Sequence, residues 1–283
     1  MLQKQSTMRY LDPKNNFILK KLFGQHPDLL ISLLNALMPL DEGQIIEKVE
    51  YLPEDMVIEI PEFNFPTLCA RCLDNRNLYF VVQIHMLWTP AFKYRIRFNS
   101  STAHIKQLDK GNKYDSLQPV YALNLVNDIF IENDEDFYHH YSIVNVEKPE
   151  RKLEGLEFVF IELPKFQPQN MDQKKMAVLW LRFLTEIKDG NHEVDEELFT
   201  QDEIRRALEM LNESAFTESE LAAYDRYWDA VSKEKTYASE KARMAREEGR
   251  EEGLEEGIEI GRQEGLEEGI EKGREEGLEE GIE

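Results

Sequence analysis

The sequence has 283 residues, of which 41% are hydrophobic and 32% charged, and its formal net charge is −22. This length and apolar content allow a sizeable core in one large or two small domains. The acidic balance excludes strong non-specific binding to nucleic acid through overall charge, because such binding needs a positive field.

The negative charge is concentrated near the C-terminal end. Residues 247–283 carry 16 Glu and four basic residues, a net charge of −12, which leaves about −10 for the rest. No apolar run approaches the ~18 residues that cross a bilayer, and no secretory leader opens the sequence, so we expect a cytoplasmic protein without a membrane partner. Two cysteines fit a reducing compartment.

The stretch LDPKNNFILKKLFG predicts a turn at Asp12 and Pro13, followed by a helix that ends at Gly24. A second apolar helix starts at Asp28 and closes at Pro39. The stretch TLCARCLDNRNLYFVVQIHM, residues 67–86, then predicts a hairpin of two strands around a polar turn. Strand alternation puts Val81, Gln83 and His85 on one face of its second strand and the apolar residues 80, 82, 84 and 86 on the other.

Residues 93–110 change to a helical pattern, the most basic in the chain. If DNA is bound, we expect its phosphates to contact this helix through Lys93, Arg95, Arg97 and Lys106. The runs PVYALNLVNDIF, SIVNV and EFVFIELPKF predict three further strands. A helix that crosses between buried strands indicates an α/β or α+β layered fold.

From residue 172 onward, apolar residues at steps of three and four predict three helices, the last with a capping box at Thr217 and Glu220. The end of the chain is a twelve-residue repeat, with glycine at every fourth position from Gly249 to Gly281. A period of four does not match the helical 3.6, and each interior glycine costs a helix roughly 1 kcal/mol. These features argue against a stable isolated helix and favour a solvated tail, with an oligomerising or partner-binding arm as the alternative.

Taken in this order, the first-helix segment, the hairpin, the strands QPVYALNLV and EFVFIELPKF and the Glu/Gly-rich end resemble the Rpn family of recombination-promoting nucleases and transposase-like proteins, of the PD-(D/E)XK nuclease superfamily. The resemblance implies an α/β PD-(D/E)XK nuclease-like core sheet flanked by helices over residues 8–166. A helical subdomain over 167–235 and an acidic Gly/Glu repeat tail over 236–283 follow. It also implies a Mg²⁺-dependent DNA endonuclease ancestry and a role in DNA recombination.

Members of the family hold Mg²⁺ with an Asp on the first hairpin strand, a Glu-x-Gln or Glu-x-Lys on the second and an acidic residue on the first helix. The matching positions here are Cys69, then Gln83 and His85, then Asn16. Because Mg²⁺ is held by carboxylate oxygens, a thiol and neutral amides remove most of its affinity. The resemblance therefore predicts a degenerate catalytic site without a metal cofactor.

Other interpretations of these residues stay open. Cys69 and Cys72 form a CxxC pair, but residues three apart on a strand point to opposite faces, so we expect buried thiols and no zinc. His85 can act as a general base only if something positions its water. Adjacent His139 and His140 lack a ligand pattern.

A carboxylate from another position can also reach the metal site, which restores an active nuclease with Mg²⁺. The candidates for this migration are Asp12, Glu59, Glu62 and Asp74. The sequence thus predicts an inactive family member. The alternatives are a non-catalytic binding or regulatory partner of active relatives, which associates with them or with itself, and an active nuclease with migrated carboxylates.

Overall fold

The structure, a computed structural model, describes residues 9–52, 68–87, 92–107, 117–129, 131–168, 175–190 and 193–280. The elements are α1 (Asn16–Gln25), α2 (Pro27–Leu37), β1 (Ile46–Tyr51), β2 (Leu68–Asp74), β3 (Tyr79–Leu87), α3 (Phe92–Ile105), β4 (Val120–Val126), β5 (Tyr138–Val144), β6 (Lys152–Glu162), α4 (Lys175–Glu186), α5 (Asp202–Met210) and α6 (Glu218–Glu280). Short 3₁₀ turns at Leu163–Lys165, Glu196–Phe199 and Glu213–Ala215 connect some of them.

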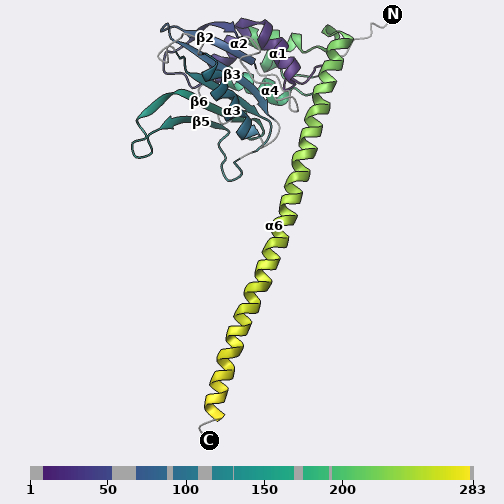
Figure 1. Cartoon of the computed structure of the whole chain (residues 1–283). Coiled ribbons are helices and arrows are strands. Elements are labelled where there is room, and N and C mark those ends of the chain that lie inside the picture. The colour runs from purple at the N-terminus through teal and green to yellow at the C-terminus, as the bar shows by residue number, and fades with distance from the viewer. Residues whose placement is uncertain are drawn as a thin grey trace, which may run out of the picture. The chain divides into compact units, whose positions relative to one another are not determined.

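The strands form a six-stranded sheet in the order β1-β2-β3-β4-β6-β5 (Figure 1). Strands β1, β2 and β3 are antiparallel neighbours, and β3, β4 and β6 run parallel. Strand β5 pairs antiparallel with β6 and closes the other edge. The predicted hairpin and the predicted strand at PVYALNLV, now β4, are confirmed in one sheet. Because β3, β4 and β6 run parallel, they all end at the same edge of the sheet.

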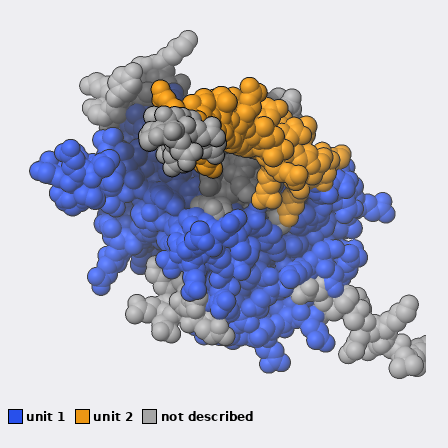
Figure 2. All heavy atoms as spheres, turned by 90° about the horizontal axis from the view of Figure 1, so that it is seen from below, with its two compact units in different colours: residues 1–232 blue, residues 233–283 orange. Residues whose placement is uncertain are grey.

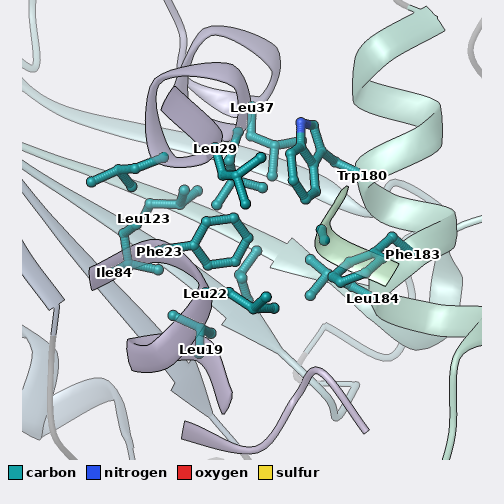
Figure 3. Close-up of a cluster of buried hydrophobic side chains, with 14 of the residues drawn as sticks. Leu19, Leu22, Phe23, Leu29, Leu37, Ile84, Leu123, Trp180, Phe183 and Leu184 are labelled. Carbon is teal, nitrogen blue, oxygen red and sulfur yellow. The ribbon is translucent and has the colours of Figure 1, made fainter. Parts of the chain in front are cut away.

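One face of the sheet carries the large core, under α1, α2 and α4 (Figure 3). Phe23 of α1 meets Trp180 of α4 edge to face, with ring centroids 5.4 Å apart. The indole N–H of Trp180 donates to Ser32 Oγ at 3.1 Å. Ile84 of β3 and Leu123 of β4 supply the sheet side of this core (Figure 3).

Helix α3 covers the opposite face of the sheet, where it contacts β4 and β6. Its residues Ile96 and Ala103 are buried against this face. The alternation predicted for the second hairpin strand is confirmed, since Val82 and Ile84 belong to the large core and Val81 lies under α3.

The helical segment after the sheet packs on the large core through α4 and α5. Arg182 of α4 binds three carboxylates, those of Glu186, Asp195 and Glu197, at 2.6 to 2.9 Å. The predicted capping box is present, because the Thr217 backbone N–H donates to Glu220 at 2.8 Å and the Glu220 N–H donates to Thr217 Oγ1 at 3.3 Å. Within the described ranges, no helix is both long and apolar enough to cross a membrane.

The chain divides into two compact units, residues 1–232 and residues 233–283 (Figure 2). Helix α6 runs without a break through the glycine repeat to Glu280, although the glycines argue against a stable isolated helix there. Glu, Arg, Lys and Leu, which fill most of the other repeat positions, are among the best helix formers and offset the glycines. Pairs four residues apart add support, such as Arg243 with Glu247 at 3.0 Å.

Candidate active site

Cys69 of β2 and Gln83 of β3 lie directly opposite each other in the antiparallel hairpin. Both side chains point to the face under α3 and are buried, with exposed fractions of 5% and 0%. Burial raises the pKa of the Cys69 thiol to about 12, and a hydrogen bond with Gln83 offsets only part of this increase. Cys69 and Gln83, the pair that the resemblance aligns with the family's carboxylates, are therefore neutral at pH 7.

His85 follows on the same face of β3 and lies beside Asn124 of β4. The Asn124 amide group donates to two backbone carbonyls, those of Ala122 and Val159, each at 2.9 Å. Gln83, His85 and Asn124 thus form a polar layer in the middle of the sheet, between the apolar clusters of Ile96 and of Ala103 on this face.

Helix α3 closes this polar layer. Ile96 packs near Ala122, and Ala103 packs near Cys69, so Ser100 between them on the same helix face lies over the layer. Ser100 is fully buried. Among the described residues of this layer, the buried atoms Ser100 Oγ and Asn124 Oδ1 have no hydrogen-bond partner.

Asn16 is buried in the first turn of α1, whose main face packs on the other side of the sheet. Its neighbour Asn15 caps the helix by accepting the Phe17 N–H at 2.9 Å and donates to the Tyr224 carbonyl at 3.0 Å. The structure thus brings Cys69, Gln83 and His85 together on the face under α3 and places Asn16 on the helix that packs on the other face.

Asp74, one of the carboxylates considered for a migrated metal site, forms hydrogen bonds in the hairpin turn. Its carboxylate accepts the Leu78 and Arg76 backbone N–H groups at 2.8 and 2.9 Å and the Gln44 amide at 2.7 Å. Burial alone would raise its pKa, but these hydrogen bonds lower it. Asp74 lies five positions after Cys69 along β2, about 16 Å of extended chain, so it is too far away to share a ligand with Gln83.

Of the other migration candidates, Glu59 and Glu62 lie outside the described residues. Asp12 is buried before α1, where its Oδ1 binds Lys14 Nζ at 2.9 Å. Burial raises the pKa of Asp12, and the Lys14 charge opposes this change.

Glu162 is a buried carboxylate that the sequence did not single out. It ends β6 on the same sheet face as Asn124, by strand parity. Its Oε2 binds Lys165 Nζ at 2.6 Å and His139 Nε2 at 3.0 Å, and its Oε1 accepts the Ile131 N–H at 3.3 Å. The sequence signal that could have identified Glu162 is an acidic residue at the end of an apolar strand. The charge of Glu162 is already compensated by Lys165.

The two remaining motifs, the adjacent histidines and the CxxC pair, make contacts that stabilise the fold and do not form a metal site. His140 binds Glu157 and His139 binds Glu162, on opposite faces of the sheet by strand parity. Cys69 and Cys72 are free thiols that point to opposite faces, as predicted, and burial raises the pKa of Cys72 to about 12. Across the described ranges, no cluster of three or more His, Cys, Asp or Glu residues is arranged to hold a metal ion.

The residues at the hairpin do not fit Mg²⁺. The ion needs near-octahedral oxygen ligands with at least one carboxylate, and the donors gathered here are a thiol, two amides, a hydroxyl and an imidazole. No anionic oxygen among them offsets the cost of dehydrating the ion.

The basic helix is described only in part. Arg97 and Lys106 are exposed on and just after α3. The side chains of Lys93 and Arg95 lie outside the described ones. A DNA contact through this helix stays a prediction.

The hairpin β2–β3 is followed by the covering helix α3 and then by β4, which pairs parallel with β3. This order, with the candidate site positions on the hairpin, defines a nuclease-type α/β core. The family model described as PD-(D/E)XK nuclease family transposase matches residues 13–241, and the chain belongs to this family. This confirms the resemblance drawn from the sequence. Neither the curated proteins nor the solved structures gave a match.

Proposed function

We propose that this protein is a nuclease-family transposase relative that does not cleave DNA at its hairpin and acts as a non-catalytic DNA-binding or regulatory protein. One observation supports the proposal: Cys69 and Gln83 face each other, buried and neutral, at the positions that we match to the family's metal-binding carboxylates. Without a held metal ion, no group at the hairpin activates a water or stabilises the leaving oxygen.

The packing under α3 supports the same conclusion. A working metal site keeps room for the ion, its waters and the substrate phosphate. Here Ala103 is buried beside Cys69, Ile96 is buried beside Ala122, and Ser100 between them on α3 is also buried. The covering helix therefore blocks access of DNA to this face at the level of the pair.

The competing function is an active nuclease with migrated carboxylates. Asp74 is too far from Gln83, so the described carboxylates that we consider for it are Asp12, named from the sequence, and Glu162, added by the structure. Each already binds a lysine, Asp12 with Lys14 and Glu162 with Lys165. A metal ion would have to displace that lysine, so we rank this alternative second. A cytoplasmic location, a role in recombination and pairing with active relatives also remain predictions.

Nicking of supercoiled plasmid in Mg²⁺ and in Mn²⁺ tests the proposal. We expect the wild type to leave the plasmid intact with either metal. The variants Asp12→Asn and Glu162→Gln serve as matched controls, because each removes one buried carboxylate. Metal-dependent nicking by the wild type that is lost in either variant would establish the migrated site and refute the proposal.

A further inference from the structure

A pocket of about 380 Å³ lies at the edge of the sheet where the parallel strands end. Asn127 follows the last residue of β4, and Leu163 and Pro164 follow the last residue of β6. In open α/β sheets, ligands bind preferentially outside the carboxyl ends of parallel strands. The volume falls within the roughly 300 to 1,000 Å³ of small-molecule sites.

The pocket is lined by charged side chains and by one large aromatic side chain, which we call the aromatic wall. The charged lining is Asp12, Lys14 and Lys188, and Trp228 of α6 supplies the aromatic ring. Lys14 is held in place, since its Nζ donates to the Leu184 carbonyl at 3.1 Å and to Asp12 Oδ1 at 2.9 Å. Lys188 is exposed, with its ammonium available to an anion.

The aromatic wall is fixed before any ligand arrives. The rings of Tyr224 and Tyr227 meet Trp228 edge to face, with centroids 6.1 and 5.5 Å away. The Tyr224 hydroxyl accepts the Asp12 N–H at 3.1 Å, which ties α6 to the segment before α1. A wall that is already ordered loses little side-chain entropy on binding.

From this combination we propose that the pocket binds a nucleotide 5′-phosphate. An exposed lysine is a usual partner of phosphate, and an indole face suits stacking of a base, which is tolerant of base identity. Asn127 and Thr185 add amide and hydroxyl groups for the sugar or base edge. Two sources share this chemistry, a free nucleotide and the 5′ end of a DNA strand.

The inference is separate from the proposed function. None of Asn16, Cys69, Gln83 and His85 lines the pocket. Plasmid nicking reports on the hairpin, and nucleotide binding reports on the pocket, so either proposal can fail while the other holds.

Binding of dTMP to the full-length protein, followed by tryptophan fluorescence and by thermal shift, tests the pocket. We expect dTMP to quench fluorescence and raise Tm, and thymidine and inorganic phosphate to bind more weakly. Lys188→Ala should weaken dTMP binding about tenfold, the loss of one charge-assisted hydrogen bond. Lys148→Ala, an exposed lysine of the β5–β6 hairpin, should bind like the wild type.

Trp228→Leu should also weaken binding, and Trp228→Phe, which keeps an aromatic ring, should recover most of it, which separates stacking from a folding defect. A 5′-phosphorylated oligonucleotide that binds more tightly than its 5′-hydroxyl form identifies a DNA end as a ligand, and equal binding of the two identifies the free nucleotide. No binding of dTMP at millimolar concentration, equal binding of thymidine or inorganic phosphate, or undiminished binding by Lys188→Ala would overturn the proposal.

Discussion

The neutral side chains of Cys69 and Gln83 determine which substitutions the hairpin can accept without loss of stability. Their Cβ atoms lie across one antiparallel pair, a separation of roughly 4.5 to 5.5 Å. At this distance under α3, neutral groups coexist, whereas two ionised carboxylates would repel each other with little water to screen them. The neutral pair is therefore compatible with a stable apo protein.

Cys69→Asp combined with Gln83→Glu should make folding depend on metal. We expect a loss of at least about 3 kcal/mol of unfolding free energy without metal, because two buried charges lack a counter-ion. Mg²⁺ or Mn²⁺ should recover much of this loss by binding only the folded state. Addition of Asn16→Asp tests whether the first helix reaches the site.

Thermal melts with and without metal measure this effect. Cys69→Asn, which adds a polar group without charge, is the matched control and should show no metal response. A large metal-dependent rise in the Tm of the wild type would mean that its own residues bind the ion.

Lys165 should be needed to keep Glu162 buried. Lys165→Met leaves the Glu162 carboxylate without its lysine partner, and we expect a loss of about 3 to 5 kcal/mol in urea unfolding. Lys165→Met with Glu162→Gln should recover most of it, because the double variant buries no charge. If the single and double variants are equally unstable, the pair is not the source of the loss.

At the scale of elements, period and turn chemistry predicted the hairpin, the strand alternation, α1, α2 and the start of α6. Strand β1 was not predicted because half of IEKVEY is charged, with Glu47 and Lys48 adjacent, so it shows no regular alternation along this exposed edge strand. The polar layer escaped because Gln83, Ser100 and Asn124 come from three elements that only the tertiary fold brings together. Glu162 escaped because its partners His139 and Lys165 are fixed by strand pairing and a following turn.

The start of α6 should give the protein a measurable acid response. A hydrogen bond from Lys21, with a further one from the Thr217 N–H, lowers the pKa of Glu220 from its usual 4.5 to about 2. A lowered pKa means that the carboxylate stabilises the fold above pH 4.5, and that this contribution is lost as the pH falls toward 2. Glu220→Gln should therefore lower Tm at pH 7 and lose less Tm than the wild type between pH 6 and pH 3.

Glu218→Gln, in the same first turn, is the control for Glu220→Gln and should keep the wild-type acid response. If Glu220→Gln lost as much Tm between pH 6 and pH 3 as the wild type does, the pH dependence would come from other carboxylates.

If α3 contacts DNA, its exposed cations should set the salt dependence of binding. Arg97→Ala with Lys106→Ala should weaken binding to all sequences alike and lower the slope of log K against log salt by about 1 for each phosphate contact removed. Fluorescence anisotropy across a salt series measures the slope. Lys148→Ala with Arg151→Ala on the β5–β6 hairpin is the matched control, and a slope that changes only there would move the DNA contact to the hairpin.

At the scale of the whole molecule, residues 1–232 hold the core and residues 233–283 form the second unit. Deletion of residues 249–283 should leave the Tm of the first unit unchanged, because the described side chains of residues 249–270 are exposed. Circular dichroism should lose helical signal equal to that segment. A helical signal unchanged by the deletion would show that the repeat is not helical in solution.

The twelve-residue repeat of α6 also sets how many contacts it offers in one direction. In a helix that turns about 100° per residue, one repeat rotates its side chains by about 120° relative to the one before. The exposed pair Leu254 and Ile258 therefore points about a third of a turn away from the exposed pair Leu266 and Ile270. A straight partner that runs parallel to the helix axis can contact one pair but not the next. This geometry therefore favours several short ligands, each bound on a different side of the helix, over one long helical partner.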